Sequence, residues 1–169
     1  MNHFLVEFSN WIQRSSISGS LRDMAWVMPT VQSIHIAAIG AVIISALMIY
    51  LPVLKVNGGA EPVAATVRRV MPWAWRGLGL LVLTGVIEIL VAPRRPLQSP
   101  AFHIKMIMIV AAFAIAALFQ RVTSTDSEFW ARSYPRIFIA KMLAIVSLLL
   151  FAAIIFAGRL TAYVPYGGR

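Results

Sequence analysis

The stretch MAWVMPTVQSIHIAAIGAVIISALMIYLPVL, residues 24–54, decides the fold because it contains no charged side chain. A helix needs about 20 apolar residues to cross the hydrocarbon core of a bilayer, and this stretch is longer than that. Pro29 suits the first turn of a helix, and Pro52 marks its far end. The stretch therefore predicts a transmembrane helix over residues 29–52.

Three further apolar runs follow, bounded by tryptophan, arginine or proline. They predict spans over 73–92, 100–120 and 137–159, with a short surface helix over 61–71 ahead of the second span. Of the 169 residues, 60% are hydrophobic and 12% are charged, and the mean hydropathy is +0.81. A soluble domain of this size carries more charge. We expect an all-α integral membrane protein, an up-and-down bundle of four transmembrane helices forming a single membrane domain over 1–169.

The N-terminal segment 3–15 has the pattern of an amphipathic helix that is too short to span a membrane. Such a helix lies at the membrane interface, with its aromatic side chains at headgroup level. The alternative is a helix that docks on a partner subunit. The run Ser18-Gly19-Ser20 is expected to end the helix. Its apolar stripe consists of Phe4, Leu5, Phe8, Trp11 and Ile12, and its polar face consists of Glu7, Asn10, Gln13 and Arg14.

The charge and the missing cysteines exclude several classes of function. The formal net charge is +9, but the basic residues flank the spans, where they contact lipid headgroups. No soluble module with a basic face is present, so nucleic acid is not an expected partner. The chain contains no cysteine, which rules out disulfides, thiolate metal sites, iron–sulfur clusters and a cysteine nucleophile.

An even number of spans places both termini on the same side of the membrane. Basic residues are almost equally numerous on the two sides, with a slight excess in the loops opposite the termini. Since cytoplasmic loops carry the excess of lysine and arginine, this difference weakly favours termini in the periplasm.

Each span carries an ionisable residue near the side where the termini emerge, and such residues inside a membrane are costly. At 1.5 Å per residue, His35 lies about 9 Å below that side, Glu88 about 6 Å and His103 about 4–5 Å. Lys105 lies close to His103 in the third span, and Arg159 ends the fourth. The other half of the bundle is almost wholly apolar, so we expect any activity in this layer.

The leading hypothesis for the layer is a b-type haem. His35 and His103 lie at similar depth on parallel helices, and two histidines on separate helices can be the axial ligands of one haem iron. Arginines near the same side can pair with the propionates. This hypothesis describes a membrane-embedded electron-transfer subunit rather than a stand-alone enzyme. The candidate cofactor-binding residues are His35, His103, Arg94, Arg95, Arg159, Gln32 and Glu88.

Three alternatives stay open. His35, Glu88 and His103 have the ligand types of a zinc or copper site, although no close spacing such as H-x₃-H joins them. Histidine and glutamate can also hydrogen-bond the headgroup of a quinone or another small molecule and relay protons. In the third alternative the chain is a non-catalytic subunit or scaffold of a larger complex, its N-terminal helix docks a redox or membrane protein partner, and the polar residues have structural roles.

Several motifs resemble those of a family of small four-span bacterial membrane proteins of unknown function. They are residues 31–40 (VQSIHIAAIG), 72–75 (PWAW) followed by 83–85 (LTG), 100–106 (PAFHIKM), and 140–141 (AK) leading to 157–163 (AGRLTAY). The resemblance covers most of the chain and implies the four-span fold, a place in the bacterial inner membrane and a role for His35, Lys105 and Arg159. A looser similarity to cytochrome b561-like and copper-resistance-D-like helical proteins favours redox chemistry.

Overall fold

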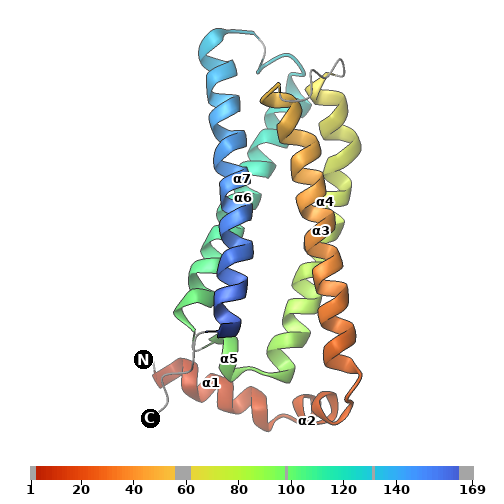
Figure 1. The fold of residues 1–169 in the computed structure, drawn as a ribbon, viewed down its shortest axis with the longest axis vertical. Coiled ribbons are helices and arrows are strands. Elements are labelled where there is room, and N and C mark those ends of the chain that lie inside the picture. Colours follow the sequence, from red (N-terminus) through yellow and green to blue (C-terminus); the bar gives the residue numbers. More distant parts are fainter. Residues whose placement is uncertain (1–2, 56–61, 98, 131, 164–169) are drawn as a thin grey trace.

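The computed structural model describes residues 3–55, 62–97, 99–130 and 132–163, with the side chains of 94, 95 and 159–163 left out. Within this part of the chain, four helices are long and apolar enough to cross a membrane, as Figure 1 shows. The all-α fold with four membrane spans, predicted from the sequence, is therefore confirmed. The spans are α3 (Val27–Val53), α4 (Val63–Val91), α6 (Pro100–Thr125) and α7 (Tyr134–Tyr163).

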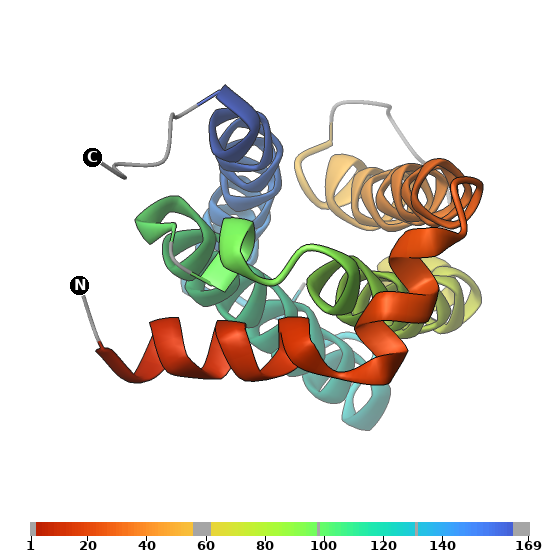
Figure 2. The ribbon, with the colours of Figure 1, turned by 90° about the horizontal axis from the view of Figure 1, so that it is seen from below.

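Consecutive spans run in opposite directions, and Figure 2, a view along the bundle, shows the ring order α3, α4, α6, α7. The closest packing is that of α3 on α4 and of α6 on α7, and contacts of α3 with α7 and of α4 with α6 close the ring. α3 and α6 are therefore diagonal. Helix α1 (His3–Arg14) lies across the end of the bundle at which α7 ends (Figure 1). We call this the terminal end, and the opposite end, with residues 54 and 126–130, the distal end.

The second span begins earlier than its sequence suggests. α4 starts at Val63, so the surface helix expected over 61–71 and the span expected from residue 73 are one helix with Pro72 inside it. The reason lies in the packing, since Val67 and Met71 are buried in the core although Arg68 between them is exposed. Burial of one helical face extends the helix past residues that look like a boundary in the sequence.

The helix predicted over residues 3–15 is confirmed as α1, and a second short helix follows it. α1 ends at Arg14, and α2 (Ser16–Asp23) includes the residues Ser18-Gly19-Ser20 that were expected to break the helix. The break falls at Ser15, whose hydroxyl accepts a hydrogen bond of 3.2 Å from the Ser18 amide and so caps α2. The connection between the second and third spans contains a further short helix, α5 (Arg94–Leu97).

The apolar core lies toward the distal end. Tyr50 and Phe119 are its largest fully buried side chains, and their rings meet edge to face at 5.9 Å. Trp130, from the connection between α6 and α7, stacks on Phe119 at 5.0 Å and donates a 3.0 Å hydrogen bond to the Thr123 hydroxyl. All four spans contribute to this core, whose buried members are Ala46, Ile49, Tyr50, Val67, Val70, Met71, Ala74, Ala116, Phe119, Ala140 and Ala144.

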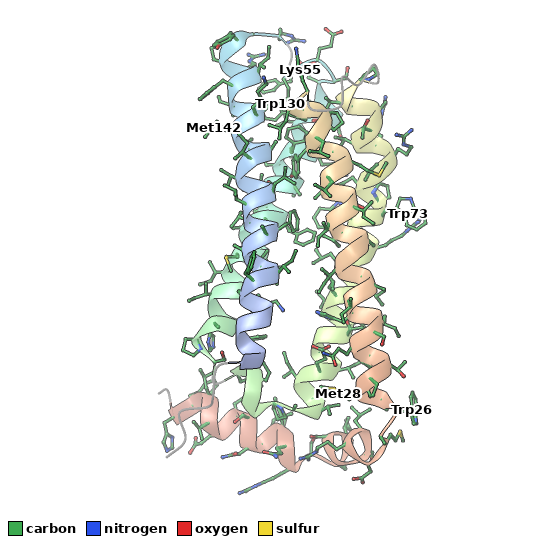
Figure 3. The ribbon with its side chains drawn as sticks, viewed as in Figure 1. Trp26, Met28, Lys55, Trp73, Trp130 and Met142 are labelled. Carbon is green, nitrogen blue, oxygen red and sulfur yellow. The ribbon has the colours of Figure 1, made fainter. Side chains whose placement is uncertain are left out.

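Exposed tryptophans lie on the outside of the bundle. Figure 3 shows Trp73 projecting outward from α4, and Trp26 at the terminal end. The Arg76 guanidinium lies 5.2 Å from the centre of the Trp73 ring, and the Trp75 indole donates a 2.8 Å hydrogen bond to Gln120 on α6. Tryptophan beside arginine is typical of the region where lipid headgroups meet the acyl chains.

Gly77 allows α3 and α4 to approach closely. A Cβ atom at this position would lie 2.8 Å from Val42 Cγ2 and 3.6 Å from the Ala38 carbonyl oxygen. A helical valine has one strongly preferred rotamer, so Val42 cannot easily move away. In a membrane, lipid solvates apolar side chains as well as a protein core does, so the hydrophobic effect does not drive helices together. Association depends on close van der Waals packing instead, and small residues at the crossing permit it.

Gly77→Ala is therefore expected to lower the free energy of unfolding by about 1–2 kcal/mol, the cost of overpacking less the gain in helix propensity. The control is Gly79→Ala on the same helix, where the added Cβ meets no atom within 4 Å. Thermal unfolding in detergent, followed by circular dichroism, measures both variants. Equal midpoints for the two would show that the Gly77 contact does not limit the packing of α3 on α4.

Candidate functional site

His35 is a residue of α3, and its side chain lies against α4 in the terminal half of the bundle. Its side chain is half-buried, and its Nδ1 atom is 2.7 Å from the hydroxyl oxygen of Thr84 on α4. Thr84 itself is buried. The next residue on α4 is Gly85, where a Cβ atom would lie 3.9 Å from His35 Cε1. An added Cβ would make only an ordinary van der Waals contact with the ring, so the imidazole lies directly against α4 at this position.

The direction of this hydrogen bond follows from the partners of Thr84. The hydroxyl has one proton, and its oxygen lies 2.7 Å from the Leu80 carbonyl and 3.2 Å from that of Leu81. Because carbonyl oxygens only accept, the Thr84 proton is donated to one of them and the hydroxyl oxygen accepts from His35. Neutral His35 therefore carries its proton on Nδ1, and its Nε2 atom presents a lone pair.

Glu88 and Lys105 join His35 in the same region. Glu88 follows Thr84 by one turn of α4 toward the terminal end, and Lys105 comes from α6. His35 interacts electrostatically with both, and Lys105 with Glu88. The Lys105 ammonium also lies beside α7, 3.8 Å from where a Cβ of Gly158 would be. We call His35, Thr84, Glu88 and Lys105 the polar cluster. It gathers a lone-pair acceptor, a carboxylate and an ammonium group inside the membrane-spanning part.

His103 is not part of the polar cluster. Its side chain is exposed, and its Nδ1 donates a 2.9 Å hydrogen bond to the Ser99 carbonyl at the start of α6. His103 precedes Lys105 by two residues, which places the two side chains about 200° apart around the helix axis. Since Lys105 faces the interior of the bundle, His103 faces outward. The structure thus brings together His35 and Glu88 of the candidate set, but not His35 and His103.

The other candidate residues are placed as follows. Gln32 is exposed one turn before His35, whose Nδ1 atom bonds to Thr84 and not to this amide. The side chains of Arg94, Arg95 and Arg159 lie outside the described residues, so their expected contacts stay predictions. Over the part of the chain that the structure describes, no group of three or more histidines and carboxylates is close enough to hold a metal ion.

Thr84 is the member of the cluster that sequence reasoning missed. A threonine in a span commonly bonds to the carbonyl four residues earlier in its own helix, as Thr84 does with Leu80, so it has no obvious functional meaning. Its position in the predicted second span is the signal that could have identified it. Thr84 lies one helical turn from Glu88, on the same face, at a depth close to that of His35.

Searches of protein-family models, of curated proteins and of solved structures found no match to this chain. The fold and the polar cluster are therefore the basis for any functional statement. Four apolar helices that contact the lipid bilayer establish a multi-pass membrane protein, and the cluster lies among those helices toward the terminal end.

Proposed function

We propose that the polar cluster binds the headgroup of a quinone, and that the chain is a quinone-binding membrane subunit. One observation carries this proposal, the hydrogen bond between His35 and Thr84 that leaves the Nε2 lone pair available. A neutral imidazole at this depth accepts a hydrogen bond from a hydroxyl group, which is the group that a quinol offers.

Lys105 supplies the complementary donor. An ammonium group donates to the carbonyl oxygen of a quinone, and Lys105, from the helix diagonal to that of His35, interacts electrostatically with His35 and Glu88. Glu88 offsets its positive charge, so that a neutral headgroup can be accommodated without adding a net charge to the membrane interior. The apolar tail of a quinone would stay among the lipid-exposed side chains of the spans, such as Ile107 and Val110 on α6.

A b-type haem is the second candidate. The available lone pair on Nε2 of His35 is the observation that supports it. Axial histidines bind iron through one ring nitrogen while the other donates a hydrogen bond that fixes the ring, as Nδ1 of His35 does toward Thr84. His35 would be an axial ligand and Lys105 would pair with a propionate. The haem would supply one-electron transfer. The outward position of His103 gives no support to a second axial ligand from this residue.

One purification tests both candidates. The protein is expressed in a bacterial host whose membrane contains quinone, purified in mild detergent, and examined by absorption spectroscopy and by chromatography of its organic extract. We expect about one quinone per chain and no Soret band. Lys105→Met is expected to lose the quinone, because it removes the ammonium donor and keeps an unbranched side chain.

His103→Phe is the matched control, because it alters an exposed residue of the same helix outside the polar cluster. It should retain the quinone at the wild-type level. A Soret band that His35→Phe abolishes would replace the quinone proposal by the haem candidate. A sample with neither chromophore, from membranes rich in both, would contradict both candidates and favour a purely structural role for the polar cluster.

A further inference from the structure

Helix α1 lies across the terminal end of the bundle (Figure 2). It contacts α2, α4 and α5. Ser9 and Ile12 are buried in these contacts, with Leu5 half-buried beside them. The spans cross the membrane, so a helix that lies across their ends is parallel to the membrane plane. The orientation of each face of α1 relative to the membrane then follows from which face contacts the bundle.

Three exposed aromatic residues form a continuous ridge along α1. Phe4, Phe8 and Trp11 stack in sequence, with ring centres 6.1 Å apart in each pair. Their exposed fractions are 73%, 40% and 70%. At 3.6 residues per turn, this aromatic ridge lies about 100° around the helix from the buried face. It therefore points sideways, in the plane of the membrane, and not toward the bundle or away from it.

The charged residues of α1 occupy the remaining face. His3, Glu7 and Arg14 are exposed and lie about 150–190° from the buried face, which directs them away from the bundle. His3 and Glu7 approach each other to 3.3 Å across one turn of the helix. With the bundle on one side and charge on the other, the aromatic ridge marks the boundary between the apolar interior of the membrane and water.

We infer that the aromatic ridge of Phe4, Phe8 and Trp11 is inserted into the boundary between headgroups and acyl chains of the membrane that the spans cross. The occupant of this surface is phospholipid. Met24 and Trp26 are further exposed apolar side chains at the same end of the bundle. The basic side chain of Arg14, on the face directed away from the bundle, matches the anionic headgroups of such a membrane.

Arg22 also holds α2 against α1. Its guanidinium donates a 2.8 Å hydrogen bond to the Gln13 carbonyl and a 3.3 Å bond to the Ser18 carbonyl. The bond to Gln13 joins α2 to α1, and α1 also contacts α4 and α5, so that α1 is oriented by the fold and not by lipid alone. A surface that is already oriented inserts without the entropic cost of ordering a free segment. The inference does not depend on the proposed function of the polar cluster.

Two adjacent positions on α1 test the inference, and the absence of native cysteine makes the labelling specific. Phe8→Cys and Glu7→Cys are each labelled with a nitroxide in the full chain and reconstituted into vesicles of phosphatidylethanolamine and phosphatidylglycerol. Electron paramagnetic resonance then measures collisions of the label with oxygen, which concentrates in the bilayer, and with a water-soluble nickel chelate. Thermal unfolding confirms that both labelled proteins are folded.

We expect the label at position 8 to collide several-fold more with oxygen than with the nickel chelate, and the label at position 7 to show the opposite ratio. A position-8 label as open to the chelate as the position-7 label would overturn the inference, because the aromatic ridge would then face water. A position-8 label shielded from both reagents, with dipolar broadening that disappears on dilution with unlabelled protein, would also overturn it by assigning the ridge to a second copy of the chain.

Discussion

Replacing Phe119 with alanine is expected to lower the free energy of unfolding by about 3 kcal/mol. Phe119 is fully buried, and two aromatic rings contact it, Tyr50 edge to face at 5.9 Å and Trp130 stacked at 5.0 Å. The substitution leaves a cavity in the place where all four spans meet. We expect the lower end of the range measured for soluble cores, because lipid and protein interior solvate apolar side chains similarly and the lost packing contacts dominate.

The control is Leu118→Ala, the preceding position on α6, where the side chain is 51% exposed on the outside of the bundle. It removes a large apolar side chain from a surface that lipid or detergent can fill again, so its effect should stay below about 1 kcal/mol. Unfolding by a denaturing detergent, followed by tryptophan fluorescence, measures both. The fluorescence of Trp130 should change in Phe119→Ala alone. Equal destabilisation by the two substitutions would mean that the distal core does not hold the bundle together.

The spans were predictable because the bilayer imposes a simple requirement on the chain. Long runs without charge, such as residues 24–54, have few alternatives to a spanning helix. The start of α4 was not predictable in this way. Arg68 and Arg69 look like a membrane boundary in the sequence. Both are exposed, however, and the preceding residue, Val67, is buried in the core. Packing against the other spans extends α4 beyond these arginines, and one sequence alone does not reveal which residues pack against each other.

For the polar cluster, the depth of each residue in the membrane was predictable from the sequence. The direction of each side chain around its helix axis was not. Counting residues from the ends of the predicted spans gave His35 and Glu88 a common layer to which Lys105 also belongs, and in the structure the three residues interact electrostatically. The same count placed His103 in the layer, yet it faces outward because it is two residues from Lys105 on α6. Which of two such residues faces inward depends on how α6 packs on α4 and α7, and that packing is not encoded in the spacing of residues along α6 alone.

Replacing Thr84 with valine is expected to weaken quinone binding about tenfold or more while the fold is retained. Valine has nearly the shape of threonine, so the buried site between α3 and α4 stays filled. The change removes the oxygen that accepts from Nδ1 of His35. The imidazole then loses the partner that fixes its tautomer and its orientation. Removing the equivalent hydrogen bond from a metal-binding histidine costs about 10–100-fold in metal affinity, and we expect an effect at the lower end of that range here.

Thr84→Ser is the matched control, because it keeps the hydroxyl and should bind nearly as the wild type does. Titration with a short-chain ubiquinone analogue in detergent measures the dissociation constants. Nitrogen NMR of protein labelled at histidine reports a consequence that lost packing alone would not produce. In the wild type the signals of His35, assigned with His35→Phe, should show the proton on Nδ1, and in Thr84→Val both tautomers should be populated. Unchanged affinity in a folded Thr84→Val protein would contradict the positioning role of Thr84. A tautomer shift without loss of affinity would show that Nε2 of His35 does not accept a hydrogen bond from the ligand. In the second tautomer Nε2 carries the proton and Nδ1 the lone pair, so a ligand that needs the Nε2 lone pair would bind more weakly.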